Sequence, residues 1–177
     1  MRLVMVRSHL EQIPEFGLPL GFSIRTFRPG DEEHWLRIHL AADKFNESSP
    51  ELFVRAFGSD ISRLGKRQLY LCDGLGAVVG TGTAWFDDDF EGARFGRVHY
   101  MAIMPEHQGR GLGKALMTAV CRRLGELGHD QTYLSTSSLR LPAIRLYRLF
   151  GFEPLIQSGE EGRVWAEVTA SLRRDRS

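Results

Sequence analysis

The sequence predicts an α/β fold, a domain built around one mixed β-sheet with helices against it. Two observations lead to this prediction. Strand-like segments alternate along the chain with segments whose apolar residues recur at helical spacing, in the order β-α-α-β-β-β-α-β-α-β-β. In addition, one strand-like segment runs through a glycine-rich turn directly into a helix.

The composition fits a single soluble domain. The chain has 177 residues, 42% of them hydrophobic and 25% charged, and a formal net charge of +1. This balance gives no electrostatic reason to expect nucleic acid or an acidic membrane as a partner. Neither Cys72 nor Cys121 lies in a CxxC motif, so we expect reduced core thiols and no metal site. The first 16 residues are too charged for a signal peptide or membrane helix, which predicts a cytoplasmic protein.

The N-terminal residues 1–21 contain Pro14, Gly17, Pro19 and Gly21, and we expect an irregular arm there. The arm would pack on its own domain or on a second subunit, so a homodimer stays open. The domain proper is expected over 22–177. A basic stretch at its end, with Arg173, Arg174 and Arg176, is expected to be a solvated terminus.

The remaining elements follow from periodicity and from their start and stop residues. Helices are expected at 31–43, where Asp31 can cap, and at 50–58, where Pro50 can occupy the first turn. An acidic loop is expected at 87–92. Strands are expected at 22–28, 68–73, 77–86, 96–104, 132–138, 152–157 and 162–172, and two further helices at 112–127 and 142–150.

The glycine-rich turn is the sharpest local feature. Gly109, Gly111 and Gly113 stand at every second position between a strand and a helix. Glycine allows positive φ, and successive N–H groups at a helix N-terminus form a site for a phosphate or pyrophosphate. Arg110 and Lys114 add positive charge. The sequence matches neither the P-loop nor the GxGxxG fingerprint, and a strand-to-helix connection without a ligand is the alternative.

Two motifs carry a resemblance to a known family. The run Gln108-Gly109-Arg110-Gly111-Leu112-Gly113 resembles the QxxGxG signature of the GCN5-related N-acetyltransferase (GNAT) superfamily, and VHYMAIMPEH before it resembles that family's preceding strand. The segment Pro142–Pro154 is similar to the family's A-I-x-L-Y-x-x-x-G-F segment. The resemblance covers roughly residues 22–172. It implies the GNAT fold and acetyl-CoA as co-substrate. It also implies transfer of the acetyl group to a primary amine of an unidentified acceptor by direct attack through a tetrahedral intermediate.

The same resemblance assigns roles to individual residues. The strand at 97–104 is expected to separate from the strand at 132–138, with the pantetheine arm of the cofactor between them. Met101 and Ile103 would bind that arm through their backbone, and Tyr147 would protonate the leaving thiolate. The pyrophosphate would be held by the turn residues Gln108, Gly109, Arg110, Gly111, Leu112, Gly113 and Lys114.

Two positions depart from the family pattern. His99 stands where many relatives have a glutamate, and it is either the general base or a residue that supports the sheet or lines the acceptor pocket. Glu106 and a bound water are the other candidates for the base. Arg140 stands where many relatives have asparagine, and it would reach the cofactor or face solvent.

The acceptor itself cannot be named from the sequence. The acidic residues at 87–91 would attract a cationic amine or form a solvated turn, and Trp35, His39, Phe45 and Phe53 would line an acceptor cleft or form core. The alternatives to an N-acetyltransferase are an enzyme with another acyl-CoA donor or an alcohol acceptor, a non-catalytic acyl-CoA-binding or regulatory module, and a nucleotide-binding protein.

Overall fold

The computed structural model describes residues 1–45 and 47–174 and contains one seven-stranded mixed sheet in the order β2-β3-β4-β5-β6-β1-β7. Only the β5–β6 pair is parallel among the described strands. This confirms the predicted fold class. The strands are β1 (Arg2–Arg7), β2 (Ser23–Thr26), β3 (Gln68–Cys72), β4 (Val78–Phe90), β5 (Ala93–Ile103), β6 (Thr132–Ser137) and β7 (Glu153–Leu155).

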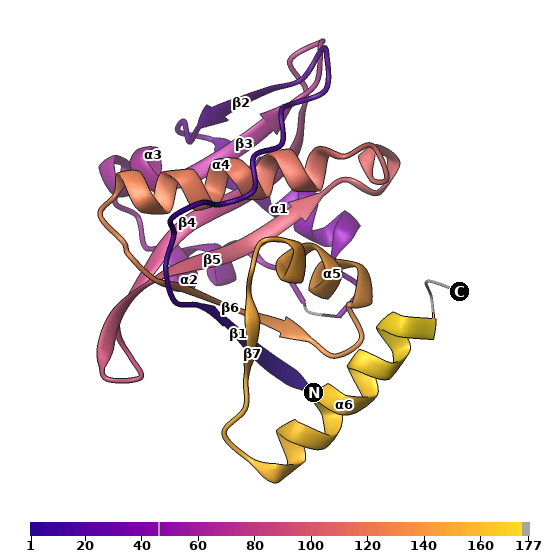
Figure 1. The fold of residues 1–177 in the computed structure, drawn as a ribbon. Coiled ribbons are helices and arrows are strands. Elements are labelled where there is room, and N and C mark those ends of the chain that lie inside the picture. The colour runs from indigo at the N-terminus through magenta and orange to yellow at the C-terminus, as the bar shows by residue number, and fades with distance from the viewer. Residues whose placement is uncertain (46, 175–177) are drawn as a thin grey trace.

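Helices cover both faces of the sheet. Helix α4 (Leu112–Glu126) crosses one face, and α1 (Asp31–Ala42) and α2 (Pro50–Phe57) lie behind the sheet in Figure 1. Helices α1 and α2 begin at Asp31 and Pro50, as predicted, and Ser49 caps α2 by accepting the Leu52 N–H. The capping role predicted for Asp31 is wrong, because Gly30 is the N-cap and the Asp31 carboxylate accepts from Arg25 and from the Arg28 N–H. The other helices are α3 (Ile61–Arg67), a 3-10 turn at Pro105–His107, α5 (Leu141–Leu149) and α6 (Gly159–Arg174).

The N-terminal arm differs from the expectation, which is wrong for Arg2–Arg7. These residues form β1, which lies between β6 and β7 and pairs antiparallel with both. Leu3 and Met5 are fully buried, so the short apolar run serves as an interior strand. The rest of the arm, 8–21, contains no helix or strand and crosses α4, where the Thr118 hydroxyl accepts from Phe16 N–H and donates to Pro14 O.

The segment 162–172 is part of helix α6, so the predicted strand there is wrong. Trp165, Val168 and Leu172 recur at helical spacing and are buried against the core. Ser158 and Glu161 cap the helix reciprocally, each accepting the other's backbone N–H. The basic residues Arg173 and Arg174 end α6, whereas Arg176 lies outside the described residues.

The acidic segment also differs from the prediction. Asp87–Phe90 continue β4, and the turn is confined to Glu91 and Gly92. Asp87 accepts the Tyr133 hydroxyl at 2.8 Å, and the Phe90 ring stacks on Tyr133 at 3.8 Å. Contacts with a distant strand therefore extend a segment that its composition marks as a loop.

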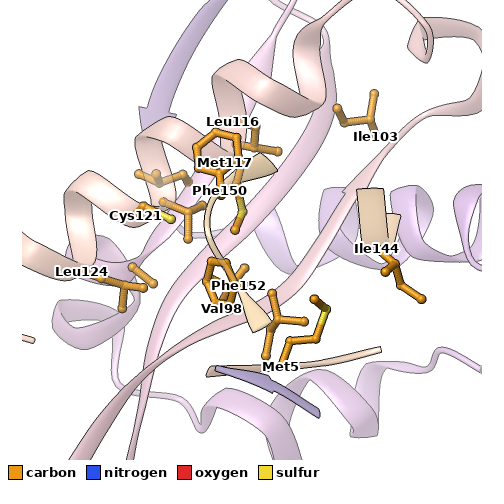
Figure 2. Packing of buried hydrophobic residues seen from close by; sticks show 14 of the residues in the cluster. Met5, Val98, Ile103, Leu116, Met117, Cys121, Leu124, Ile144, Phe150 and Phe152 are labelled. Atoms are coloured by element: carbon orange, nitrogen blue, oxygen red, sulfur yellow. The ribbon is translucent and has the colours of Figure 1, made fainter. Parts of the chain in front are cut away.

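Two apolar cores hold the sheet. The larger core joins α4, α5, α6 and the sheet, and Figure 2 shows Met5, Met117, Phe150 and Phe152 interleaved in it. The smaller core is aromatic and lies between the sheet and α1–α3, around the fully buried Trp35. Cys72 and Cys121 are buried free thiols, as expected. Among the described helices, none is long and apolar enough to cross a membrane.

Candidate active site

The two parallel strands β5 and β6 separate partway along their length. In the described chain they pair only at Gly96–Thr132 and Arg97–Tyr133, supported by a Gly96 N–H to Gln131 O hydrogen bond of 2.9 Å. The remaining six residues of β5, 98–103, have no partner on that side. The predicted separation of these strands is therefore confirmed, and it leaves backbone groups of β5 available to a ligand.

A bulge in β5 causes the change of direction. Thr81 pairs with Ala102 and Thr83 pairs with His99, so Tyr100 and Met101 together face the single residue Gly82 of β4. Tyr100 has φ of 46°, a conformation that is strained for a bulky residue. Backbone strain is concentrated where the strands part, next to both His99 and Met101.

The glycine-rich turn follows β5 after the short 3-10 turn at Pro105–His107, and its residues 108–111 are exposed. Gly109 and Gly111 have φ of 74° and 80°, and Gly111 is the N-cap of α4 without a side-chain cap. The Gln108 side chain donates to Ile103 O at 2.9 Å and ties the turn to the end of β5. In the part of the chain that is described, the five N–H groups of 109–113 have no acceptor. This is the arrangement expected of an anion site.

Phe16 of the arm and Phe22, the residue just after the arm, support the two cations of this turn. The Arg110 guanidinium lies 5.0 Å from the Phe22 ring, and Lys114 Nζ lies 5.2 Å from the Phe16 ring. These contacts hold both cations beside the free N–H groups. The sequence assigned no such role to these two residues, whose aromatic rings were the available signal.

Tyr147 lies on α5 and is half-buried, with its ring 6.3 Å from that of Phe152. Its hydroxyl makes no hydrogen bond with another described residue. Burial raises the pKa of Tyr147, and the positive charge of Arg140 opposes part of that increase. The phenol is therefore protonated at neutral pH and free to donate a proton.

His99 lies on the opposite side, toward the aromatic core. Its ring is 4.3 Å from that of Tyr100 and 5.6 Å from that of Phe57. Desolvation lowers the pKa of His99 well below its ordinary value, and the charges of Arg97 and His39 lower it further. The imidazole is neutral at pH 7, the form in which it can accept a proton. Glu106, the other candidate, is exposed in the 3-10 turn and lies 4.0 Å from His107 Nδ1.

Arg140 makes a contact that the sequence did not predict. It is the N-cap residue of α5 and forms an ion pair with Asp43, which follows the C-terminus of α1. Its guanidinium also lies 5.1 Å from the Phe45 ring. The segment after α1 is thus fastened to the start of the helix that carries Tyr147.

His39 contacts the same Tyr100 ring as His99, and the sequence left it as a residue of the acceptor cleft or of the core. It is buried, and burial lowers its pKa to about 4 although the Asp43 carboxylate opposes the change. Its Nε2 and the Trp35 Nε1 have no hydrogen-bond partner among the described residues. Two imidazoles that resist protonation, His39 and His99, therefore lie against the same Tyr100 ring.

This pair predicts loss of stability in mild acid. The folded-state pKa values of His39 and His99 are depressed, so the unfolded chain binds protons that the folded chain excludes. Stability is complete above the unfolded value of about 6.5 and falls as the pH decreases toward 4. Urea unfolding at pH 7.5 and 5.0 measures the change. In His39→Gln the decrease should be smaller, and an equal decrease in both proteins would contradict this assignment.

A mixed sheet whose two parallel strands separate ahead of a glycine-rich turn is the arrangement expected of the class of acyl-CoA N-acyltransferase folds. A family model described as the acetyltransferase (GNAT) family matches residues 33–152. The chain belongs to the GNAT family.

Named relatives agree with this assignment. The chain is 34% identical to a mycothiol acetyltransferase of Saccharomonospora viridis, over 85% of this chain and 52% of the relative. It is also 34% identical to a mycothiol acetyltransferase of Pseudarthrobacter chlorophenolicus, over 86% of this chain and 48% of the relative. The chain spans about half the length of these curated relatives.

Solved structures show the same fold. A GCN5-related N-acetyltransferase of Sphaerobacter thermophilus has a TM-score of 0.71 and 25% identity, covering 87% of this chain and 48% of the other. The ribosomal-protein-S18-alanine N-acetyltransferase of Escherichia coli has a TM-score of 0.63 and 20% identity, covering 76% of this chain and 79% of the other. The latter likeness supports the fold alone.

Proposed function

We propose that this protein transfers the acetyl group of acetyl-CoA to a primary amine. The observation that supports this most is that two features lie close together along the chain. The unpaired edge of β5 is followed, after one short 3-10 turn, by five backbone N–H groups without an acceptor among the described residues. A long ligand with an amide-containing arm and a pyrophosphate matches that sequence of backbone donors and acceptors.

The donor end fits the residues present. The N–H groups of 109–113, with Arg110 and Lys114 beside them, would hold the pyrophosphate. The backbone of Met101 and Ile103 would bind the pantetheine arm, although the Ile103 carbonyl already accepts from Gln108. A carbonyl oxygen has two lone pairs, so this hydrogen bond does not prevent a second one.

Substituting Gly111 tests the donor site. Alanine at φ of 80° is strained by about 1–2 kcal/mol, while its Cβ would meet no atom within 4 Å. If the turn relaxes to relieve this strain, its N–H groups lose their alignment, and acetyl-CoA affinity should fall about 5- to 30-fold in calorimetry. Gly125→Ala is the matched control, because it lies in the same helix, meets no atom within 4 Å and has no positive φ. Equal affinities for the two variants would contradict the assignment.

The chemistry has three requirements, and each has a candidate. The attacking amine must lose a proton, the carbonyl oxygen needs hydrogen-bond donors, and the leaving thiolate needs a proton. Tyr147 would supply the last of these. Backbone N–H groups at the end of β5 would supply the second. His99, next to the bulge, would accept the amine's proton directly or through water, as a weaker base than a free imidazole because its pKa is depressed.

A turnover assay separates catalysis from simple binding. Acetyl-CoA is supplied with a panel of primary amines, their matched alcohols and the acceptor of mycothiol acetyltransferase, and released CoA thiol is measured together with the mass of the product. We expect an increase of 42 Da on an amine only. Transfer to the alcohols would change the reaction class, and tight acetyl-CoA binding without transfer to any acceptor would favour a regulatory acyl-CoA-binding module.

A further inference from the structure

A second candidate site lies far from the glycine-rich turn. A surface depression with a volume of about 410 Å³ lies between α3 and the β4–β5 hairpin. Its lining includes Asp60, Ser62 and Asp88. Four cations, Arg63, Lys66, Arg67 and Arg94, also line it, and Phe86 contributes an aromatic ring. We call these four cations and Phe86 the basic depression. Leu127, at the C-terminal end of α4, also borders it, whereas the glycine-rich turn precedes the N-terminus of that helix. The length of α4 therefore separates the two sites by about 20 Å.

The buried member of the basic depression is Arg67, which is 9% exposed. Its Nη1 donates to Ala84 O at 2.9 Å and lies 3.3 Å from His129 Nε2, and the guanidinium lies 4.6 Å from the Phe86 ring. No carboxylate of the described residues forms an ion pair with it. A buried cation without an ion-pair partner is costly, so an anion bound beside Arg67 would be stabilising.

Like charges gather around this cation. The guanidinium groups of Arg63 and Arg94 lie 5.9 Å and 5.7 Å from the same Phe86 ring. Desolvation lowers the pKa of Arg67, repulsion by Arg94 and Arg63 adds to the effect, and the Asp88 carboxylate opposes part of it. The fold thus holds three guanidinium groups against one ring, an arrangement that an anion among them would stabilise.

The charge that remains gives the class of anion. Arg63 pairs with Asp60 at 3.7 Å and Arg94 pairs with Asp88 at 3.1 Å, and both pairs are exposed. These two ion pairs do not include Arg67 or Lys66. The depression therefore keeps a net charge of two positive charges, one from each of these residues. A phosphate monoester carries a charge of about −1.5 to −2 at pH 7, and its oxygens match the donors of a guanidinium.

We propose that the basic depression binds the phosphate monoester of a small molecule, with Arg67 as the buried anchor and Arg63, Lys66 and Arg94 at the rim. The volume is sufficient for a small phosphorylated metabolite and lies within the range of ligand pockets. This ligand is separate from the acetyl donor, and the inference does not depend on the proposed acyl transfer.

Calorimetry at constant ionic strength tests the proposal. Glycerol phosphate, inorganic phosphate and the dicarboxylate succinate are titrated into the full chain, with saturating CoA present so that the donor site is filled. We expect saturable binding of glycerol phosphate, weaker binding of inorganic phosphate, and little binding of succinate. Equal binding of all three, or no saturation at millimolar concentration, would overturn the proposal.

Variants at the rim keep the test independent of folding. Lys66→Gln and Arg94→Gln change exposed residues, and each should weaken glycerol phosphate binding about tenfold. Arg163→Gln, an exposed arginine on α6, is the matched control and should leave affinity unchanged. Unchanged affinity in both rim variants would overturn the proposal. Gly111→Ala should reduce acetyl-CoA binding without altering phosphate binding, so failure of either site is recognised separately.

Discussion

Replacing Tyr147 with phenylalanine should lower kcat by about 10²- to 10⁴-fold, the contribution typical of a positioned proton donor. The substitution removes the hydroxyl and keeps the ring that packs against Phe152. Affinity for acetyl-CoA should stay nearly unchanged, because the expected contacts of the donor are with β5 and the glycine-rich turn. Steady-state kinetics on an accepted amine, together with calorimetry, would measure both quantities.

Tyr133→Phe is the control for this substitution. It also removes a phenolic hydroxyl, one that donates to Asp87 at the far end of the β4–β5 hairpin. We expect a small loss of stability and unchanged kcat. Turnover of Tyr147→Phe close to that of the unsubstituted protein would remove Tyr147 from the mechanism and leave the thiolate to depart unprotonated or with a proton from water.

Replacing Trp35 with alanine should reduce the free energy of unfolding by about 3–5 kcal/mol. Trp35 is 0% exposed and contacts the rings of four residues at 4.4–5.9 Å, namely His39, Phe53, Phe57 and Tyr100. Because no nearby side chain is free to fill the space, most of the cavity should remain. Urea unfolding at pH 7.5 would measure the loss.

Phe45→Ala provides the comparison, since Phe45 is half exposed and should cost less than about 1 kcal/mol. Trp35→Ala should also lower activity, because Tyr100 is part of the bulge that parts β5 from β6. A loss below 1 kcal/mol for Trp35→Ala would contradict the central position of Trp35 in the aromatic core.

The part of the site that is continuous in sequence was predictable. The positive φ values of Gly109 and Gly111 are typical of glycine in a tight turn and can be expected from the local sequence. Helix α4, which follows them, has a clear helical period of apolar residues. The separation of β5 from β6 came from the family resemblance. The bulge at Tyr100 was not predicted, because it depends on the pairing of β5 with β4.

Elements that depend on distant partners were missed. β1 has only four consecutive apolar residues, and its strand character comes from pairing with β6, about 130 positions away. Helix α6 contains β-branched Val164, Val168 and Thr169, which favour a strand locally, yet its buried residues follow a helical period. Arg140 was assigned to cofactor or solvent because its partner, Asp43, is 97 positions distant.

Thermal unfolding with acetyl-CoA, CoA, ATP and NAD at equal concentrations tests the central claim, that the site formed by β5 and the glycine-rich turn binds an acyl-CoA. At a ligand concentration about 100 times Kd, stabilisation is about 2.7 kcal/mol, which corresponds to an increase in Tm of roughly 5–10 °C for a chain of this size. We predict this increase with acetyl-CoA and CoA, and a much smaller increase in Gly111→Ala. Equal protection by ATP or NAD would contradict the claim and identify a general nucleotide site.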